Sequence, residues 1–398
     1  MKIAIVSNLY KPFFMGGAEV SSELLARGLR DAGHEAFVIS AALDPAGARA
    51  ENVDGVPVHR LPTGLPYPIL SHARQPRWAK IRWHAMDLWN PTVHAAATRV
   101  LETERPQVVH TNVLAGLSPS LWTAARRLGI PVLHTMRDYY LLCVRSSLTK
   151  ASGALCERRC AHCWAFSQWQ RWLTGNLSAI VGISQFVLGK HREFGFFHNI
   201  PGHVIPNAVP PSGAACTPKP PGLPLVLVYM GRLASSKGPQ VVLETLAREP
   251  KLPVRLHVCG AGPDAEELHA RYGLDSRVVF EGNVTGDRKQ AILNQADVMV
   301  VPSIWHEPFG RTVIEAYQHG LVVIASRAGG LPELIEEGST GRLFEPGNGQ
   351  QLAALLSELA AAPDKLAAMK QRAAERARDF SLTRHVENYL AVYRSLQQ

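Results

Sequence analysis

The first half of the chain alternates short apolar runs with stretches of helical periodicity. Lys2–Ser7 predicts a buried strand, and apolar residues then recur at helical spacing from Ala18 to Ala32, where Gly33 ends the pattern. Further apolar runs of strand length follow at Ala36–Ser40, Gln107–His110, Pro131–His134 and Ala179–Ile183. Because strands buried on both faces of a sheet read as continuous apolar runs, this rhythm predicts a parallel, doubly wound α/β sheet.

The second half repeats the pattern after a break. Residues 206–224 are rich in Pro, Gly, Ser and Ala, which predicts a linker. Strands are then expected at Leu225–Tyr229, Arg255–Cys259, Val278–Glu281, Val298–Val301 and Val322–Ala325, and helices at Gln240–Ala247, Asp264–Tyr272 and Lys289–Ala296. The chain of 398 residues is too long for one compact core, so we expect two Rossmann-like domains facing a cleft, residues 1–210 and 211–380. An amphipathic segment within 381–398 predicts a helix that packs back on the first domain.

Charge is distributed unevenly between these halves. Residues 1–210 hold 22 Lys and Arg against 13 Asp and Glu, whereas the rest holds 20 of each, so the whole excess of +9 lies in the first half. A one-sided positive field favours an anionic partner such as a membrane surface or a phosphorylated acceptor. Nucleic-acid binding is disfavoured because the second half, with its ligand-binding loops, is neutral. An Arg-rich proteome would also explain the excess.

Two Gly-rich loops follow strands of the second half. The segment from Gly231-Arg232 to Lys237-Gly238 offers a flexible backbone and two cations, which suits a diphosphate. Gly260-Ala261-Gly262 follows the next strand and opens a helix, whose N-terminus favours anions. Structural turns would explain either loop equally well.

A stronger pattern runs from Glu307 to Glu315. Pro308 and Gly310 predict a loop that enters a helix near Arg311 and ends at Gly320. Both carboxylates are therefore expected at the strand edge where a ligand would lie, and carboxylates accept hydrogen bonds from the paired hydroxyls of a polyol. Two solvated surface acids are the alternative explanation.

Taken in order, these motifs resemble the family-4 retaining glycosyltransferases of the GT-B fold. The resemblance covers almost the whole chain. Its segments are Gly16-Gly17-Ala18-Glu19, Gly182-Ile183-Ser184, Ile205-Pro206-Asn207-Ala208, Gly231 through Gly238, Glu307 through Glu315, Gly329-Gly330-Leu331-Pro332-Glu333 and Gly338-Ser339-Thr340-Gly341.

The resemblance implies a role for each segment. Arg232 and Lys237 would neutralise the donor diphosphate and the leaving group, in place of a catalytic metal or other cofactor. Glu315 would hold the ribose, and Glu307 the sugar hydroxyls. No enzyme nucleophile would be needed, since the leaving phosphate would take the acceptor's proton. The other residues that the resemblance places at the donor are Gly16, Gly17, Gly231, Gly260, Asn283, Val284, Phe309, Gly310, Arg311 and Thr312.

The chain departs from the family on the acceptor side. Many relatives carry His-x-His where this chain has His110-Thr111-Asn112, so Asn112 replaces a His that touches the donor sugar. Asn can bond a hydroxyl but cannot hold a proton. Arg137-Asp138 replaces a His-Asp pair and adds a permanent charge at the expected acceptor site. These changes leave open a sugar-nucleotide-binding protein with weak or no transfer. An epimerase or hydrolase would need acid–base groups in both domains, which the motifs do not suggest.

A cysteine cluster lies in the first domain. Cys143, Cys156, Cys160 and Cys163 have two short spacings, with His162 beside them, and suit a tetrahedral structural zinc. Unpaired thiols in a long loop are the alternative.

Aromatic and basic residues interleave in the same domain. Seven of the eight Trp lie there, and two groups of them stand among Arg and Lys. This suits a membrane interface or ordinary helix packing. The chain opens with a strand instead of a signal peptide and has no apolar run of about 18 residues, so a cytoplasmic protein is expected, peripheral on the inner face of the membrane if these residues bind lipid.

Overall fold

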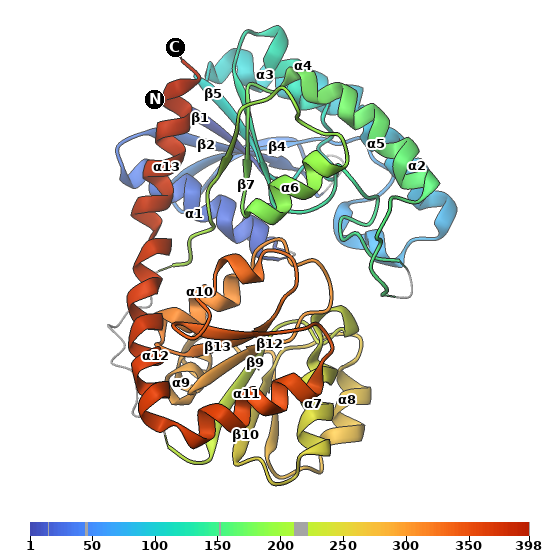
Figure 1. Ribbon diagram of the computed structural model, residues 1–398. Coiled ribbons are helices and arrows are strands. Elements are labelled where there is room, and N and C mark those ends of the chain that lie inside the picture. Colours follow the sequence, from blue (N-terminus) through green and yellow to red (C-terminus); the bar gives the residue numbers. More distant parts are fainter. Residues whose placement is uncertain (15, 44–46, 151–152, 211–221, 398) are drawn as a thin grey trace. The chain divides into compact units, whose positions relative to one another are not determined.

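The computed structural model describes residues 1–14, 16–43, 47–150, 153–210 and 222–397. They form two compact units (Figure 1): unit 1 comprises Met1–Leu148, Cys156–Ala208 and Leu382–Gln398, and unit 2 comprises Thr149–Leu155 and Val209–Ser381. Most of the expected linker, residues 211–221, lies outside the described residues. Each unit is an α/β domain built on a parallel sheet, which confirms the predicted fold class.

The described part of unit 1 contains an eight-stranded sheet in the order β3-β4-β2-β1-β5-β6-β7-β8. All neighbours pair in parallel except β3 with β4, which form an antiparallel edge. The strands are β1 Lys2–Val6, β2 Glu35–Ala41, β3 Arg49–Val53, β4 Val56–Leu61, β5 Val108–Thr111, β6 Val132–Met136, β7 Ala179–Gly182 and β8 Gly202–Val204.

Helices cover the sheet of unit 1, and the last of them comes from the end of the chain. Helix α13 (Leu382–Ser395) packs against α1 (Gly17–Asp31), where Gly28 leaves room for it: a Cβ on Gly28 would lie 2.7 Å from Val386 Cγ2. Tyr389 and Tyr393 of α13 are fully buried in the same core as β1 and β2. The helices are α1 Gly17–Asp31, η1 Ile69–Arg74, α2 Arg77–Leu88, α3 Pro91–Glu104, α4 Ser120–Arg127, α5 Ala161–Leu173, η2 Thr174–Asn176, α6 Gln185–Glu193 and α13 Leu382–Ser395.

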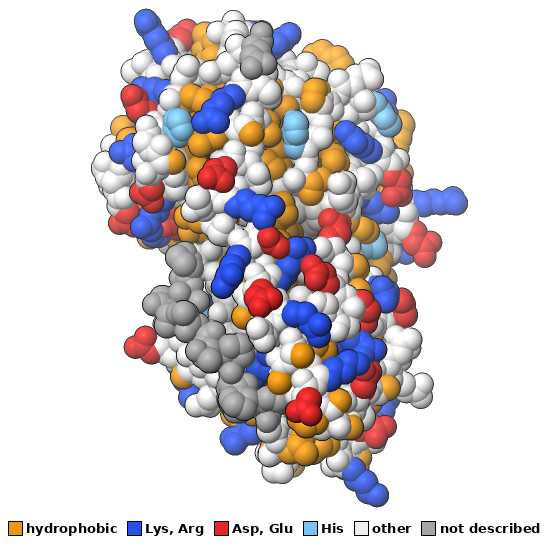
Figure 2. All heavy atoms as spheres, turned by 60° about the vertical axis from the view of Figure 1, so that its left-hand side comes forward, with side chains coloured by type: hydrophobic (Ala, Val, Ile, Leu, Met, Phe, Trp, Pro, Cys, Tyr) orange, Lys and Arg blue, Asp and Glu red, His pale blue; other side chains and the backbone are white. Residues whose placement is uncertain are grey.

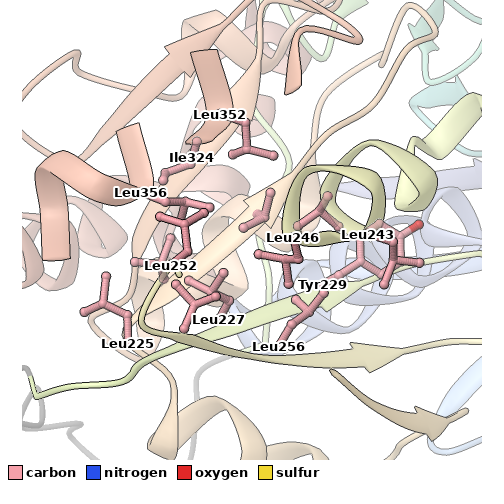
Figure 3. Packing of buried hydrophobic residues seen from close by; sticks show 14 of the residues in the cluster. Leu225, Leu227, Tyr229, Leu243, Leu246, Leu252, Leu256, Ile324, Leu352 and Leu356 are labelled. Atoms are coloured by element: carbon pink, nitrogen blue, oxygen red, sulfur yellow. The ribbon is translucent and has the colours of Figure 1, made fainter. Parts of the chain in front are cut away.

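The described part of unit 2 contains a six-stranded, wholly parallel sheet in the order β11-β10-β9-β12-β13-β14. Its strands are β9 Leu225–Met230, β10 Val254–Cys259, β11 Val278–Gly282, β12 Val298–Val301, β13 Val322–Ser326 and β14 Gly341–Phe344. Alternate residues of β9, Leu225, Leu227 and Tyr229, pack against α7 (Pro239–Arg248) and α11 (Gly349–Ala361) in one core (Figure 3). The helices are η3 Ser235–Lys237, α7 Pro239–Arg248, α8 Ala265–Tyr272, α9 Gly286–Gln295, α10 Arg311–Gln318, η4 Leu331–Glu333, α11 Gly349–Ala361, α12 Pro363–Arg376 and η5 Ala377–Phe380.

Basic and acidic side chains are interspersed on the face drawn in Figure 2. None of the described helices has the length and apolarity that a bilayer crossing demands.

Candidate functional site

Four loops meet at the carboxyl edge of the sheet in unit 2, and glycines allow their backbones to touch. Gly260, at φ +151°, follows β10, and a Cβ there would lie 1.9 Å from the carbonyl oxygen of Gly231 in the loop after β9. Gly329, at φ +63°, follows β13, and its Cβ would lie 2.2 Å from the carbonyl oxygen of Glu307. Side chains are therefore excluded at both contacts. The amide of Gly330 also donates to Glu307 O at 2.7 Å, which fixes the loop after β12.

Two residues predicted to bind the donor meet directly at this edge. Lys237, at the end of η3, places Nζ 2.7 Å from Oε1 of Glu307, and Ser303 Oγ donates to the same oxygen at 2.7 Å. The Lys237 ammonium also lies 4.7 Å from the ring centroid of Trp305. The pair presents an ammonium that can donate and a carboxylate that can accept hydrogen bonds.

The charge state of Glu307 follows from this contact. Burial by itself would raise the pKa of the Glu307 carboxyl, but the charge of Lys237 and the hydrogen bonds from Lys237 and Ser303 outweigh burial and hold the pKa below its ordinary value. Glu307 is therefore a carboxylate at neutral pH. Ser303, four residues earlier, was not among the predicted site residues, because an isolated serine in a loop carries no distinctive pattern.

Helix α10 carries the other predicted carboxylate. Gly310, at φ +121°, turns the chain into the helix, and a Cβ there would lie 2.5 Å from Leu331 Cδ2. Glu315 is half-buried, and its Oε2 lies 2.8 Å from Lys289 Nζ on α9. Phe309 is buried, and Arg311 and Thr312 are half-buried in the first turn. Lys289 was missed, since no motif marks it.

The remaining predicted donor residues lie in loops at the same sheet edge. Arg232 is exposed in the loop after β9, beside Gly231. Tyr229 Oη donates to the carbonyl oxygen of Arg232 at 2.8 Å. Asn283 is exposed and Val284 half-buried between β11 and α9. The Lys289–Glu315 contact links that helix to α10. The second unit thus brings most of the predicted donor residues to one edge of one sheet.

In unit 1, the predicted Gly16-Gly17 loop begins helix α1. The amide of Gly16 donates to Oε2 of Glu19 at 2.9 Å, in a capping arrangement that buries Glu19 at the helix start. Both glycines are exposed.

A buried arginine joins three segments of unit 1. Nε of Arg137 donates to Oδ1 of Asn112 at 2.8 Å, and Nη1 donates to Oδ1 of Asn207. Nη2 is buried and has no hydrogen-bond partner among the described residues. Burial lowers the pKa of the Arg137 guanidinium. Because the ordinary pKa of an arginine is very high, the guanidinium nevertheless stays charged. The two departures from the family, Asn112 and Arg137, are therefore one structural unit, which sequence reasoning treated separately.

His110 lies deeper than the other predicted acceptor-side residues. Its Nδ1 lies 2.6 Å from Tyr393 Oη of α13, and its Nε2 lies 2.7 Å from Thr135 Oγ1. Burial, together with the charge of Arg137, keeps the pKa of His110 well below its ordinary value. Both nitrogens are thus occupied inside unit 1, where the neutral ring anchors α13 to the sheet.

Two aspartates in this region have raised pKa values. Burial raises the pKa of Asp138 to about 6, and its Oδ1 accepts from the amide of Tyr140 at 2.9 Å. Asp87 of α2 is fully buried and was not predicted; burial raises its pKa to about 7 although Tyr140 Oη donates to it at 2.5 Å. The sequence shows Asp87 only as one acid in a helical stretch.

Two α/β units built on parallel sheets, with the predicted motif loops at the sheet edge of the second, are typical of the GT-B fold, and comparisons with known proteins agree. The sequence matches the family Glycosyl transferases group 1 over residues 218–376 and the Glycosyl transferase 4-like domain over residues 16–208. The chain belongs to the group 1 glycosyltransferases. A Klebsiella pneumoniae protein described as an uncharacterized 42.6 kDa protein in the cps region is 32% identical over 84% of this chain and 87% of its own length.

Other known proteins resemble this chain over part of its sequence or in their fold. D-inositol 3-phosphate glycosyltransferase of Corynebacterium efficiens is 36% identical over 40% of this chain and 41% of its own length. Among solved structures, sucrose-phosphate synthase of Thermosynechococcus elongatus has a TM-score of 0.76 at 21% identity, covering 99% of this chain and 98% of the other. Anabaena HepE, in complex with UDP, has a TM-score of 0.72 at 20% identity, covering 99% and 100%. These structural likenesses concern the fold.

Proposed function

We propose that this chain is a retaining, metal-independent hexosyltransferase that moves a sugar from a UDP- or GDP-sugar to a glycan, lipid-linked or small-molecule acceptor. The contact between Lys237 and Glu307 carries the proposal. A nucleotide-diphosphate sugar has an anionic diphosphate bonded to a ring rich in hydroxyls. An ammonium adjoining a carboxylate complements those two groups in the same order.

The chemistry follows from the charges. Lys237, aided by the exposed Arg232, stabilises the negative charge that grows on the leaving diphosphate as the glycosidic bond breaks. Glu307 holds the sugar through its hydroxyls and Glu315 holds the ribose. A leaving phosphate oxygen takes the acceptor's proton on the face from which it departs, so configuration is retained without a covalent enzyme intermediate.

The similar proteins support the substrate class. HepE has been solved in complex with UDP and with UDP-glucose, and starch synthase IV with ADP and acarbose. The Klebsiella relative from the cps region supports a place in polysaccharide or glycoconjugate biosynthesis.

The first experiment measures nucleotide binding by titration calorimetry with UDP, GDP and ADP. We expect one diphosphate to bind well above the others. Its affinity is then compared with that of its 2′,3′-dideoxy analogue, in the native chain and in Glu315→Gln. If Glu315 holds the ribose, the native chain prefers the hydroxylated ligand by about 10-fold or more, and the variant loses that preference.

The control is Glu266→Gln, an exposed acid in the first turn of α8, which should keep the preference. Absence of binding by any nucleoside diphosphate would end the transferase proposal. Binding of a diphosphate sugar without transfer to glycan, lipid or water would favour the alternative, a sugar-nucleotide-binding protein. The Arg137–Asn112 contact supports that alternative, because it occupies the Asn112 oxygen.

We also propose that unit 1 associates peripherally with an anionic membrane surface. Helices α2 and α5 contact each other through His84 and Phe166, whose ring centroids lie 5.8 Å apart. Each leaves large apolar side chains in solvent: Trp78 and Trp172 are 69% and 70% exposed. Arg74, Arg77, Arg82 and Arg171 are exposed beside them, and aromatic rings among cations suit the headgroup region.

Flotation with vesicles tests this surface. We expect binding to vesicles containing phosphatidylglycerol at low salt, weaker binding at high salt, and a loss of at least about 5-fold in Trp78→Ala/Trp172→Ala. Leu274→Ala, at a 98% exposed apolar residue of unit 2, is the matched control and should bind as the native chain does. Failure of the native chain to float at low salt would refute membrane association.

A further inference from the structure

A group of sulfur and nitrogen atoms lies at the start of helix α5 in unit 1. The ligand atoms of Cys160, His162 and Cys163 all lie within 4.8 Å of one another. Cys160 Sγ lies 3.4 Å from His162 Nε2. A fourth residue, Cys143, comes from the segment after β6, and its Sγ lies 4.0 Å from Cys163 Sγ.

Two of these separations match edges of a tetrahedral zinc site. Zinc bonds of about 2.3 Å to sulfur and about 2.0 Å to nitrogen place two sulfurs about 3.8 Å apart, and a sulfur and a nitrogen about 3.5 Å apart. The Cys143–Cys163 and Cys160–His162 separations lie within about 0.2 Å of those values. A disulfide would require the two sulfurs to approach to about 2.05 Å.

We propose that Cys143, Cys160, His162 and Cys163 bind one structural zinc ion. From spacing alone, the four cysteines were the expected ligands. His162 takes the place of Cys156 in the proposed set, because its ring nitrogen groups with the sulfurs of Cys160 and Cys163. Cys143 joins the set through its Sγ, which lies 4.0 Å from that of Cys163.

The surroundings favour bound thiolates. Cys160 is the N-cap residue of α5, and His162 and Cys163 lie in the first turn, where the free amides and the helix dipole favour negative charge. The neighbouring Arg159 is held in place by Ser167 Oγ at 2.5 Å and by the Phe194 carbonyl oxygen at 2.9 Å. Cys160 and His162 are exposed, so an ion can enter, whereas Cys143 and Cys163 are buried.

The ion would join two segments that the backbone leaves separate. Cys143 follows Tyr140, whose hydroxyl donates to the buried Asp87 of α2, and the other three ligands begin α5. Zinc would thus clamp the segment after Arg137 to helix α5, and the inference stands apart from the proposed transfer reaction.

The test uses the full chain, purified without chelator and freed of any histidine tag, and measures metal by mass spectrometry. We expect about one zinc per chain, and less than about a tenth of an equivalent in Cys143→Ser and in Cys160→Ser. Cys156→Ser should keep its zinc, and so should Cys259→Ser, a buried thiol of β10 in unit 2. Circular dichroism of each variant reports whether it folds.

Cobalt keeps the test decisive where a serine variant does not fold. Substitution of cobalt into the native chain should give visible bands of tetrahedral coordination and a near-ultraviolet thiolate charge-transfer band. In a folded His162→Ala variant the visible bands should change, because one of the four proposed ligands is lost, whereas the thiolate band comes from the three remaining cysteines. Less than about a tenth of an equivalent of zinc in the native chain would overturn the proposal, as would a Cys143–Cys163 disulfide in unreduced protein. Loss of metal in Cys156→Ser with retention in His162→Ala would overturn the ligand set.

Discussion

Lys237 Nζ lies 2.7 Å from Glu307 Oε1, with the lysine side chain 31% exposed and the glutamate side chain 10% exposed. The Lys237 ammonium is therefore the more exposed group of the pair, while the carboxylate accepts a hydrogen bond from Ser303. This asymmetry makes Lys237 the member of the pair that should dominate binding of an anion.

Lys237→Ala should weaken binding of the preferred nucleoside diphosphate by about 10- to 100-fold, since a hydrogen bond to a charged group contributes about 1.5–3 kcal/mol. Titration calorimetry measures the change. Lys251→Ala, at an exposed lysine of unit 2, is the control and should leave the affinity unaltered. Equal affinities in the native chain and Lys237→Ala would remove Lys237 from the donor site.

Arg137 and Asn112 should behave as one unit in a double-mutant cycle. Asn112→Ala and Arg137→Met each break the 2.8 Å hydrogen bond, so the cost of the double variant should fall short of the sum by about 1–3 kcal/mol. Urea unfolding gives the free energies. Asn176→Ala, whose Nδ2 bonds the Leu173 carbonyl, should combine additively with Arg137→Met. Additivity of Asn112→Ala would show that the two residues are independent.

Asp87 should make stability depend on pH. Burial raises its pKa to about 7 in the folded chain, above the value of about 3.9 in unfolded peptides. The folded state therefore holds the proton more tightly, and the stability that this gives is present below pH 4 and lost as pH rises through 7.

Relative to Asp87→Asn, the native chain should lose on the order of 3 kcal/mol of unfolding free energy between pH 4 and pH 8. Urea unfolding at a series of pH values measures it. Asp364→Asn, at an exposed aspartate of α12, should run parallel to the native chain. A constant difference between native chain and Asp87→Asn across this range would mean that Asp87 has an ordinary pKa.

Tyr393→Phe should destabilise unit 1 by about 1–3 kcal/mol, because it leaves the buried Nδ1 of His110 without its partner. Urea unfolding again measures the cost. Tyr272→Phe, at a half-buried tyrosine of α8, should cost less than about 0.5 kcal/mol. A loss in Tyr393→Phe no larger than in this control would indicate that the His110 contact adds nothing to the docking of α13.

The sequence predicted the central strands and the motif loops well, because buried parallel strands and Gly-rich turns have local signatures. It did not predict β3, β4, β8 or β14. Three of these, β3, β8 and β14, are edge strands with few buried residues. In β4, buried residues alternate with half-buried ones instead of forming a continuous apolar run. The sequence also did not predict which residues far apart in the chain contact one another. Arg137 bonds residues 25 and 70 positions away, and nothing local marks those partners.

The site shows the same division. Lys237 and Glu307 could be assigned to one ligand from their motifs, but not their direct contact across 70 positions. Cysteine spacing predicted a metal site with Cys156 among its ligands, whereas the ligand set that we propose contains His162, because that choice depends on how the start of α5 faces Cys143.

The docking of α13 has a consequence for how the protein is made. The core of unit 1 is completed by side chains that leave the ribosome only after all of unit 2 has been synthesised. Domains usually fold in the order in which they emerge. Here unit 2 can complete its folding before unit 1, because unit 1 lacks α13 until the end of synthesis and leaves apolar side chains of α1 uncovered. We therefore expect a nascent chain stalled before Leu382 to expose apolar surface of unit 1 that a chaperone could cover.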